Sequence, residues 1–295
     1  MRYAEFISGI RTAYEHRGGL KMFACGQVED SWFKQICSEV NWILDSQSAS
    51  DVTSKDHVTN WTRPTGEARQ FSLFNRTGKT DDFLSDHSFD RSTKRLTFPH
   101  LNGIQRFAKL FGPNLLNLRL NGLGKSSGLG AHEERSIQST ARGLMYKIRF
   151  HLPIYTNPDA RICLDGEMFH FEPGVLYFFN QGCVHAAINI GDAPRYHFVL
   201  DCLLTRKLHT NLLSQKGKPV DDRGFRTLNA FEAKGYNKSE PWSPADFTTE
   251  AGTLRTRLDY GRVAPELLDF LRGQRPNLFA RFDQFLGRNP RKVGL

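Results

Sequence analysis

The sequence predicts a mainly β protein with helical flanks. Between residues 115 and 205, short apolar segments follow one another closely, and tight-turn sequences separate several of them. Before and after this region, apolar residues recur at intervals of three and four, as they do on the buried face of a helix. Many short strands with close turns are typical of a β-sandwich or barrel, so we expect such a core between helical segments.

The expected strands are identified by their apolar residues and by the turn sequences between them. Asp165-Gly166 is a strong signal for a two-residue hairpin. Glu172-Pro173-Gly174 is a second tight turn. The expected strands cover 71–75, 115–121, 144–152, 160–164, 168–171, 175–179, 186–190 and 195–200.

Five segments fit amphipathic helices. In the first third of the chain, Gly112-Pro113 ends the last of them. Near the C-terminus, Pro265 stands at a first helical position, where the missing N–H of proline costs nothing. The expected helices cover 3–10, 32–43, 103–111, 265–272 and 278–286. The polar segment 79–95 is expected to be irregular.

Composition excludes several classes of protein. Of the 295 residues, 39% are hydrophobic and 24% are charged, so the chain can bury a core and is not disordered throughout. No apolar stretch approaches about 18 residues, which excludes a membrane-spanning helix, and Glu5 interrupts any apolar segment of a secretory signal. The five cysteines include no Cys-x-x-Cys pair, which excludes a zinc finger or disulfide scaffold. We therefore expect a cytoplasmic protein with no membrane partner.

The net charge of +9 is concentrated in the last third of the chain. Residues 206–295 hold 17 Lys and Arg against 10 Asp and Glu, which gives +7 and leaves +2 for the rest. Such a segment can attract nucleic acid, anionic lipid or a phosphorylated small molecule, or it can be a solvated surface. Because the charges are interspersed, the pattern argues against a nucleic-acid partner. The loop 122–130 lacks the spacing of a P-loop, so nucleotide hydrolysis is not expected.

His132, Glu134 and His185 form a candidate metal site. Alternate residues of an extended chain project to the same side, so His132 and Glu134 share a face. A histidine on a facing strand, such as His185, completes a set of two imidazoles and one carboxylate. This is the ligand set of non-haem Fe(II) oxygenases, whose open positions take a cosubstrate and O₂. We therefore expect these three residues to be the metal ligands and the catalytic centre.

Two arginines on apolar strands indicate an anionic ligand. Arg195 begins one strand, and Arg149 shares the face of another with His151. A cation buried on a strand is costly unless it is paired, and a five-carbon dicarboxylate would use both arginines. The alternative is that one or both face solvent or pair with acids of the chain itself. The acids considered for this pairing are Asp165, Asp192 and Asp201. His197 shares a face with Arg195 and could contact the ligand or only pack.

The same residues lie in segments that resemble the aspartyl/asparaginyl β-hydroxylase family. The segments are Arg149-Phe-His-Leu-Pro-Ile, Phe171-Glu-Pro-Gly-Val-Leu-Tyr-Phe-Phe-Asn, Val184-His185 and Arg195-Tyr-His-Phe-Val-Leu-Asp201. Within the family, the bacterial proline hydroxylases look closer than the animal enzyme. The match is good from about Leu115 to Leu204. A fainter similarity reaches back to Trp61.

The resemblance implies an Fe(II)- and 2-oxoglutarate-dependent oxygenase with a double-stranded β-helix, which is a jelly-roll, cupin-like core. We therefore expect three regions. Residues 1–58 form an N-terminal helical or mixed flank, residues 59–205 the oxygenase core, and residues 206–295 a basic, partly helical C-terminal region.

The resemblance also assigns individual residues. His132 and His185 match the two iron-binding histidines. Glu134 matches the carboxylate ligand, where proline hydroxylases have aspartate and the animal enzyme has no carboxylate. The residues matched to 2-oxoglutarate are Arg195 and Asn121, at its far carboxylate, and Arg149 and His151, near its iron-side carboxylate.

The expected activity is hydroxylation of an unactivated C–H in a small anionic metabolite, amino acid or peptide, with O₂ and 2-oxoglutarate as cosubstrates. One alternative is a cupin-like binding protein whose metal is structural or absent. Another is an oxygenase that modifies nucleotides or nucleic acid. Two inward arginines favour the oxygenase over the binding protein, and salt-dependent retention on heparin or DNA would reveal a nucleic-acid partner.

Overall fold

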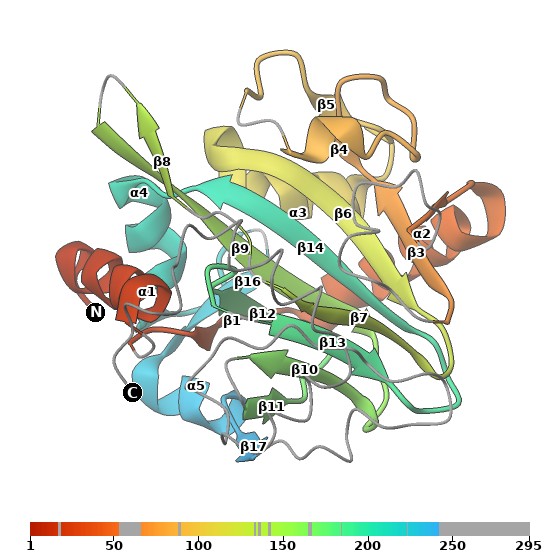
Figure 1. Ribbon diagram of the computed structural model, residues 1–295. Helices are drawn as coiled ribbons and strands as arrows, with labels where there is room; N and C mark the ends of the chain where they lie inside the picture. The colour runs from red at the N-terminus through yellow and green to blue at the C-terminus, as the bar shows by residue number, and fades with distance from the viewer. Residues whose placement is uncertain are drawn as a thin grey trace.

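The computed structural model shows two antiparallel β-sheets that face each other, with helices around them (Figure 1). It describes residues 1–16, 19–52, 66–87, 90–132, 134, 137–140, 143–164, 167–183, 185–222 and 224–241. The two facing sheets form a double-stranded β-helix of the jelly-roll, cupin-like type. The predicted mainly β fold with flanking helices is therefore confirmed.

The larger sheet carries most of the site. Its strands, in order across the sheet, are β15 (Lys216–Lys218), β16 (Phe225–Asn229), β1 (Met22–Val28), β12 (Val175–Phe179), β9 (Gly143–Tyr155), β14 (Arg195–Leu203), β6 (Leu115–Leu123), β3 (Ala68–Ser72) and β2 (Ser50–Asp51). A further strand, β8 (Ile137–Thr140), pairs with β9. The long strands β6, β9 and β14 are neighbours, so side chains far apart in the sequence lie next to one another.

The smaller sheet covers the inner face of the larger one. Its strands, in order, are β17 (Ser239–Pro241), β11 (Glu167–Phe169), β10 (Ala160–Leu164), β13 (His185–Asn189) and β7 (Ser127–His132). Strands β10 and β11 pair antiparallel with Leu164 opposite Glu167, and the turn predicted at residues 165–166 between them lies outside the described residues. A separate ribbon joins β4 (Phe74–Asn75) to β5 (Arg95–Leu96).

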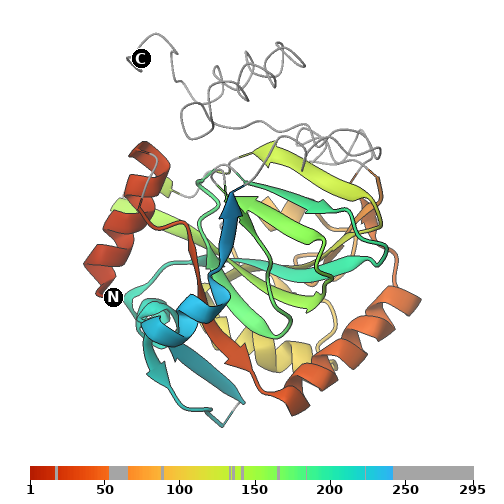
Figure 2. The ribbon, with the colours of Figure 1, turned by 90° about the horizontal axis from the view of Figure 1, so that it is seen from below.

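Helices cover the other face of the larger sheet. On this face lie α1 (Tyr3–His16), α2 (Asp30–Ser46), α3 (Asn102–Phe111) and α4 (Arg206–Leu208). Helix α5 (Ala230–Tyr236) instead packs through Ala233 into the apolar cluster that includes Ile162 and Leu164 of the smaller sheet. The short turns are η2 (Leu84–His87), η3 (Gly112–Asn114) and η4 (His209–Leu213). Trp32 and Ile36, one turn apart on α2, are buried, which is the spacing that predicted this helix. Figure 2 shows α2 and α3 on the same side of the sheets.

Strand alternation then places the polar residues inside the molecule. On β9, Phe150 and Leu152 belong to the apolar cluster that includes side chains of α2 and α3. The alternate residues Arg149 and His151 project to the opposite face, between the two sheets. The helices thus determine which face of β9 carries the functional side chains.

Several predictions concern the segments before and after the predicted core. The helices expected at 265–272 and 278–286 lie outside the described residues. The division into regions at residues 58 and 205 stays a prediction. Strands from both flanks nevertheless join the sheets, because β1 pairs with β12 and β16 pairs with β1.

Two further observations concern the membrane and the cysteines. None of the helices in the described part of the chain is long and apolar enough to cross a membrane. All five cysteines are free thiols, and four of them are buried.

Candidate active site

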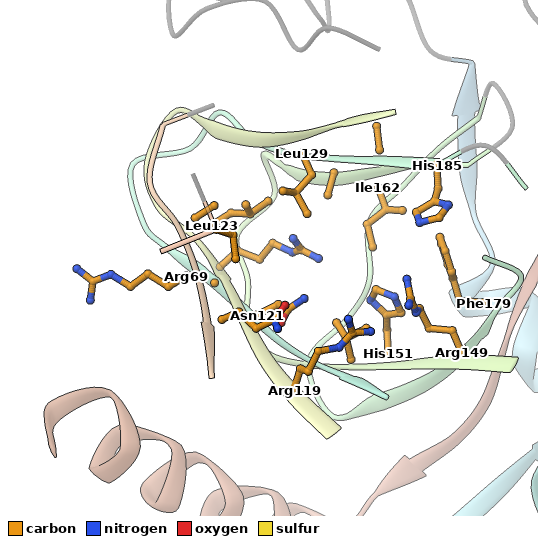
Figure 3. A pocket seen from close by; sticks show the side chains of 18 of the residues that line it. Arg69, Arg119, Asn121, Leu123, Leu129, Arg149, His151, Ile162, Phe179 and His185 are labelled. Atoms are coloured by element: carbon orange, nitrogen blue, oxygen red, sulfur yellow. The ribbon is translucent and has the colours of Figure 1, made fainter. Parts of the chain in front are cut away.

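The candidate site is a cavity between the two sheets (Figure 3). Arg119, Arg149 and His151 reach it from the larger sheet, and His185 reaches it from the smaller one. The predicted residues Asn121, Glu134 and Arg195 line the same cavity. The structure therefore brings together all the predicted site residues whose side chains it describes.

The two predicted histidine ligands lie opposite each other in the smaller sheet. Strand β13 pairs with β7 so that the backbone of His185 faces that of His132. The His185 ring is buried, and its Nδ1 lies 2.9 Å from the carbonyl oxygen of Cys183, which fixes the ring orientation. A metal-bound histidine typically donates its second N–H in this way. The side chain of His132 lies outside the described residues, so its role stays a prediction.

Glu134 forms an ion pair with Arg149. Arg149 Nη1 donates to Glu134 Oε1, and Arg149 Nη2 donates to Glu134 Oε2 at 2.8 Å. Lys147 Nζ lies 3.8 Å from the same carboxylate. Burial opposes ionisation, but Arg149 and Lys147 hold the pKa of Glu134 well below its usual range. The carboxylate predicted to bind the metal is thus engaged by a guanidinium in this structure.

Asp201 is the second acid on Arg149. Its carboxylate accepts from Arg149 Nε at 2.8 Å, from Arg149 Nη2 at 3.1 Å and from Asn117 Nδ2 at 2.8 Å. Arg119 Nη2 lies 3.4 Å from Asp201 Oδ2. Burial opposes its ionisation, but Arg149, Lys147 and Arg119 together hold the pKa of Asp201 far below its usual range. One of the alternatives considered for Arg149, pairing with Asp201, is therefore present.

Arg195 is placed differently. It is buried, and no carboxylate of the described residues lies within ion-pair distance of it. Its Nε and Nη2 lie 3.2 Å and 3.0 Å from the ring nitrogens of His197. Burial lowers the pKa of Arg195 to about 10. Asp192, one of its possible partners, instead pairs with Lys125, and Asp165 lies outside the described residues.

Two neutral histidines and an amide complete the site. Burial, followed by Arg149 and Arg195, lowers the pKa of His151 well below its usual value, and burial and Arg195 do the same for His197. Within the described part of the chain, neither ring nitrogen of His151 has a hydrogen-bond partner, and neither has Oδ1 of Asn121. Buried polar atoms left in this state are typical of ligand sites.

The donor set fits Fe(II) in its chemistry. Two imidazoles and a carboxylate are the ligands that non-haem iron oxygenases use. No group of three His, Cys, Asp or Glu side chains among the described residues is arranged to hold a metal ion. Two facts account for this: Glu134 is turned to Arg149, and the side chain of His132 is outside the described residues.

The sequence reasoning missed Arg119, Lys147 and Asn117. Lys147 lies on β9, two residues before the predicted site residue Arg149. Arg119 lies on β6, two residues before the predicted Asn121, and Asn117 lies two residues before Arg119. The same alternation that placed Arg149 and His151 on one face would have placed Lys147 there too. Asn117, Arg119 and Asn121 follow the same rule on β6.

A protein-family model described as aspartyl/asparaginyl β-hydroxylase matches residues 34–204, more than half of the chain. The chain belongs to the aspartyl/asparaginyl β-hydroxylase family. This match confirms the resemblance seen in the sequence. Because the chain is a member of this family, the protein is a dioxygenase of the hydroxylase type. No curated protein matches its sequence.

Solved structures similar to this hydroxylase-family protein are distant. An oxidoreductase of the 2OG-Fe(II) oxygenase family from Burkholderia pseudomallei has 13% identity and a TM-score of 0.37, covering 56% of this chain and 77% of its own. The α-ketoglutarate-dependent epimerase SnoN of nogalamycin biosynthesis has 9% identity and a TM-score of 0.42, covering 68% and 82%. A predicted oxalate decarboxylase from Thermotoga maritima has 11% identity and a TM-score of 0.32, covering 54% and 96%. The family assignment rests on the family model alone.

Proposed function

We propose that this protein is an Fe(II)- and 2-oxoglutarate-dependent oxygenase that hydroxylates an unactivated C–H of a small anionic metabolite, amino acid or peptide. The observation that carries the proposal is Arg195. A buried guanidinium without a carboxylate partner in the described part of the chain is unfavourable unless a ligand supplies the anion. The far carboxylate of 2-oxoglutarate is such an anion.

The residues around Arg195 support a cosubstrate at this place. His197 contacts two nitrogens of the guanidinium and so restricts its orientation. Asn121 lies opposite His197 on the neighbouring strand and lines the same cavity. Its amide can donate a second hydrogen bond to the carboxylate that Arg195 binds.

His132, Glu134 and His185 are the residues that would hold Fe(II), which supplies O₂ activation when bound. His185 is pre-oriented by the carbonyl of Cys183, so its second ring nitrogen has a fixed direction. His151 is neutral and packs against Phe179 with ring centroids 4.8 Å apart. It is therefore placed to donate or accept one hydrogen bond at the iron-side carboxylate of the cosubstrate.

Arg119 supports an anionic prime substrate. It is buried, lines the cavity, and its Nε has no hydrogen-bond partner among the described residues. Its link to Asp201 is long, at 3.4 Å, and that carboxylate already accepts from Arg149 and Asn117. A carboxylate or phosphate of the substrate could use the remaining donors. The five free cysteines favour a reducing compartment such as the cytoplasm.

The test is anaerobic addition of Fe(II) and 2-oxoglutarate, followed by absorption spectroscopy. A keto acid bound to a facial Fe(II) site gives a weak visible charge-transfer band, and His132→Ala and His185→Ala should each abolish it. His100→Ala, at an exposed histidine beside Trp42, is the matched control and should keep it. A band that survives both ligand substitutions would show that the iron ligands are assigned wrongly. Succinate formation over a panel of anionic metabolites then identifies the substrate.

A further inference from the structure

Arg149 has almost no hydrogen-bonding capacity left for a ligand. A guanidinium carries five N–H donors. Arg149 makes two hydrogen bonds to Asp201 and two to Glu134, which occupies four of these donors. An anion that enters the cavity of this structure therefore finds Arg149 already occupied by two acids of the same chain.

The two acids differ in how firmly they are held. The Asp201 side chain is 2% exposed, lies within β14, and exchanges hydrogen bonds with Asn117 through both its backbone N–H and its carboxylate. The Glu134 side chain is 18% exposed and lies just beyond the end of β7, where its backbone N–H donates to the carbonyl of Gln181. Glu134 is thus the acid that can leave Arg149 with the smaller change to the fold.

We propose that Glu134 occupies an anion subsite on Arg149 in the metal-free protein, and that a ligand carboxylate takes this subsite when Glu134 turns to the metal. The inference rests on the proposed function for its metal step. Both oxygens of Glu134 contact Arg149, which is the two-point geometry that a guanidinium offers to any carboxylate. A metal that takes the lone pairs now offered to Arg149 must displace at least one of these two contacts.

The local charge balance supports the exchange. Within ion-pair distance of one another lie three cations, Arg119, Lys147 and Arg149, and two acids, Asp201 and Glu134. Among these five described groups, the cations exceed the acids by one while Glu134 stays. When Glu134 leaves, the excess becomes two, and a carboxylate beside Arg149 restores the balance. Metal loading and anion binding should therefore promote each other.

The first test measures oxalate binding to the full chain by calorimetry after removal of metal and chelator. Oxalate serves as a small carboxylate probe that needs neither iron nor turnover. Glu134→Gln should raise the oxalate affinity by about tenfold or more, because a neutral amide replaces the carboxylate on Arg149. Glu167→Gln is the matched control: Glu167 lies on β11 of the smaller sheet, and its loss breaks the 2.6 Å ion pair with Lys21 but should not change the oxalate affinity.

A second variant shows where oxalate binds in the Glu134→Gln protein. Removing Arg149 itself could unfold the protein, because Asp201 would lose its main partner. The double variant Glu134→Gln, Arg195→Met leaves Arg149 intact and should keep the gain in oxalate affinity. Equal affinities of the wild type and Glu134→Gln would overturn the proposal, and so would a gain that disappears with Arg195→Met.

Mn(II) affinity tests the metal step. Glu134→Gln should weaken Mn(II) binding by about tenfold or more, whereas Glu167→Gln should leave it unchanged. Unchanged Mn(II) binding in Glu134→Gln would overturn the exchange. The outcome for the proposed function is separate: an oxalate gain in a protein that forms no succinate would support the subsite on Arg149 and reject the oxygenase.

Discussion

The two ends of the cavity treat a buried arginine in opposite ways. At one end, Arg149 is bound by Glu134 and Asp201. At the other, Arg195 is equally buried, contacts His197, and has no carboxylate within ion-pair distance among the described residues. Burial of a charge is unfavourable in both places, but only one of them is compensated by the chain itself. The difference indicates that acids of the chain compensate Arg149 in the ligand-free protein, whereas only a ligand can supply the anion for Arg195.

The largest expected effect is on stability at the compensated end. Asp201→Asn should lower the free energy of unfolding by about 3–5 kcal/mol, because it leaves Arg149, Arg119 and Lys147 without their shared acid. Urea unfolding measures this change. The matched control is Asp192→Asn, which breaks an exposed pair with Lys125 and should leave the free energy of unfolding unchanged within experimental error. If both variants lose the same small amount, the buried network does not stabilise the fold as described.

Arg195→Met should give the opposite result. Because this guanidinium has no carboxylate partner in the described part of the chain, replacing it with an apolar side chain removes a desolvation penalty. We expect the free energy of unfolding of the ligand-free protein to stay within about 1 kcal/mol of the wild type or to rise. A loss of about 3 kcal/mol or more in urea unfolding would mean that Arg195 is a structural residue like Arg149.

The histidines of the site predict a smaller effect of pH. The pKa values of His151 and His197 are lowered by burial, so the unfolded chain takes up protons at these positions near pH 6.5 while the folded chain does not. Their contribution to stability is complete above about pH 6.5 and is lost as the pH falls below it, by up to about 1.4 kcal/mol per pH unit for each histidine. Urea unfolding of the metal-free protein between pH 7.5 and 5.5 measures the slope, and His197→Gln should reduce it. An unchanged slope in this variant would show that His197 titrates normally.

The features of the site that depend on a local pattern of apolar and polar residues could be predicted from the sequence. Alternation placed Arg149 and His151 on one face of their strand, and the apolar segment after Arg195 predicted β14. Strand β1 was not predicted. Its first five residues are all buried, so its sequence lacks the alternation of apolar and polar residues that marks a strand with one exposed face. Buried strands of this kind cannot be distinguished from other apolar segments by period.

The choice of partners for the arginines could not be predicted. Asp201 meets Arg149 because β14 and β9 pair in the register that sets these two residues opposite each other. That register is fixed by long-range packing of the whole sheet, not by the residues near either position. The sequence therefore named Asp201 as one of three acids for Arg149, and only the folded arrangement selected it. Glu134 lies beyond the end of β7 and contacts Arg149 across 15 residues of sequence, so no local pattern marks this pair either.

The most direct test of the central assignment is the affinity of 2-oxoglutarate for the Fe(II)-loaded protein, measured anaerobically by equilibrium binding in the wild type and in Arg195→Met. If Arg195 is the residue that binds the far carboxylate, the variant should bind 2-oxoglutarate about a hundredfold or more weakly while remaining as stable as the wild type. An unchanged affinity in a folded Arg195→Met protein would contradict the account, because the buried guanidinium would then serve no ligand.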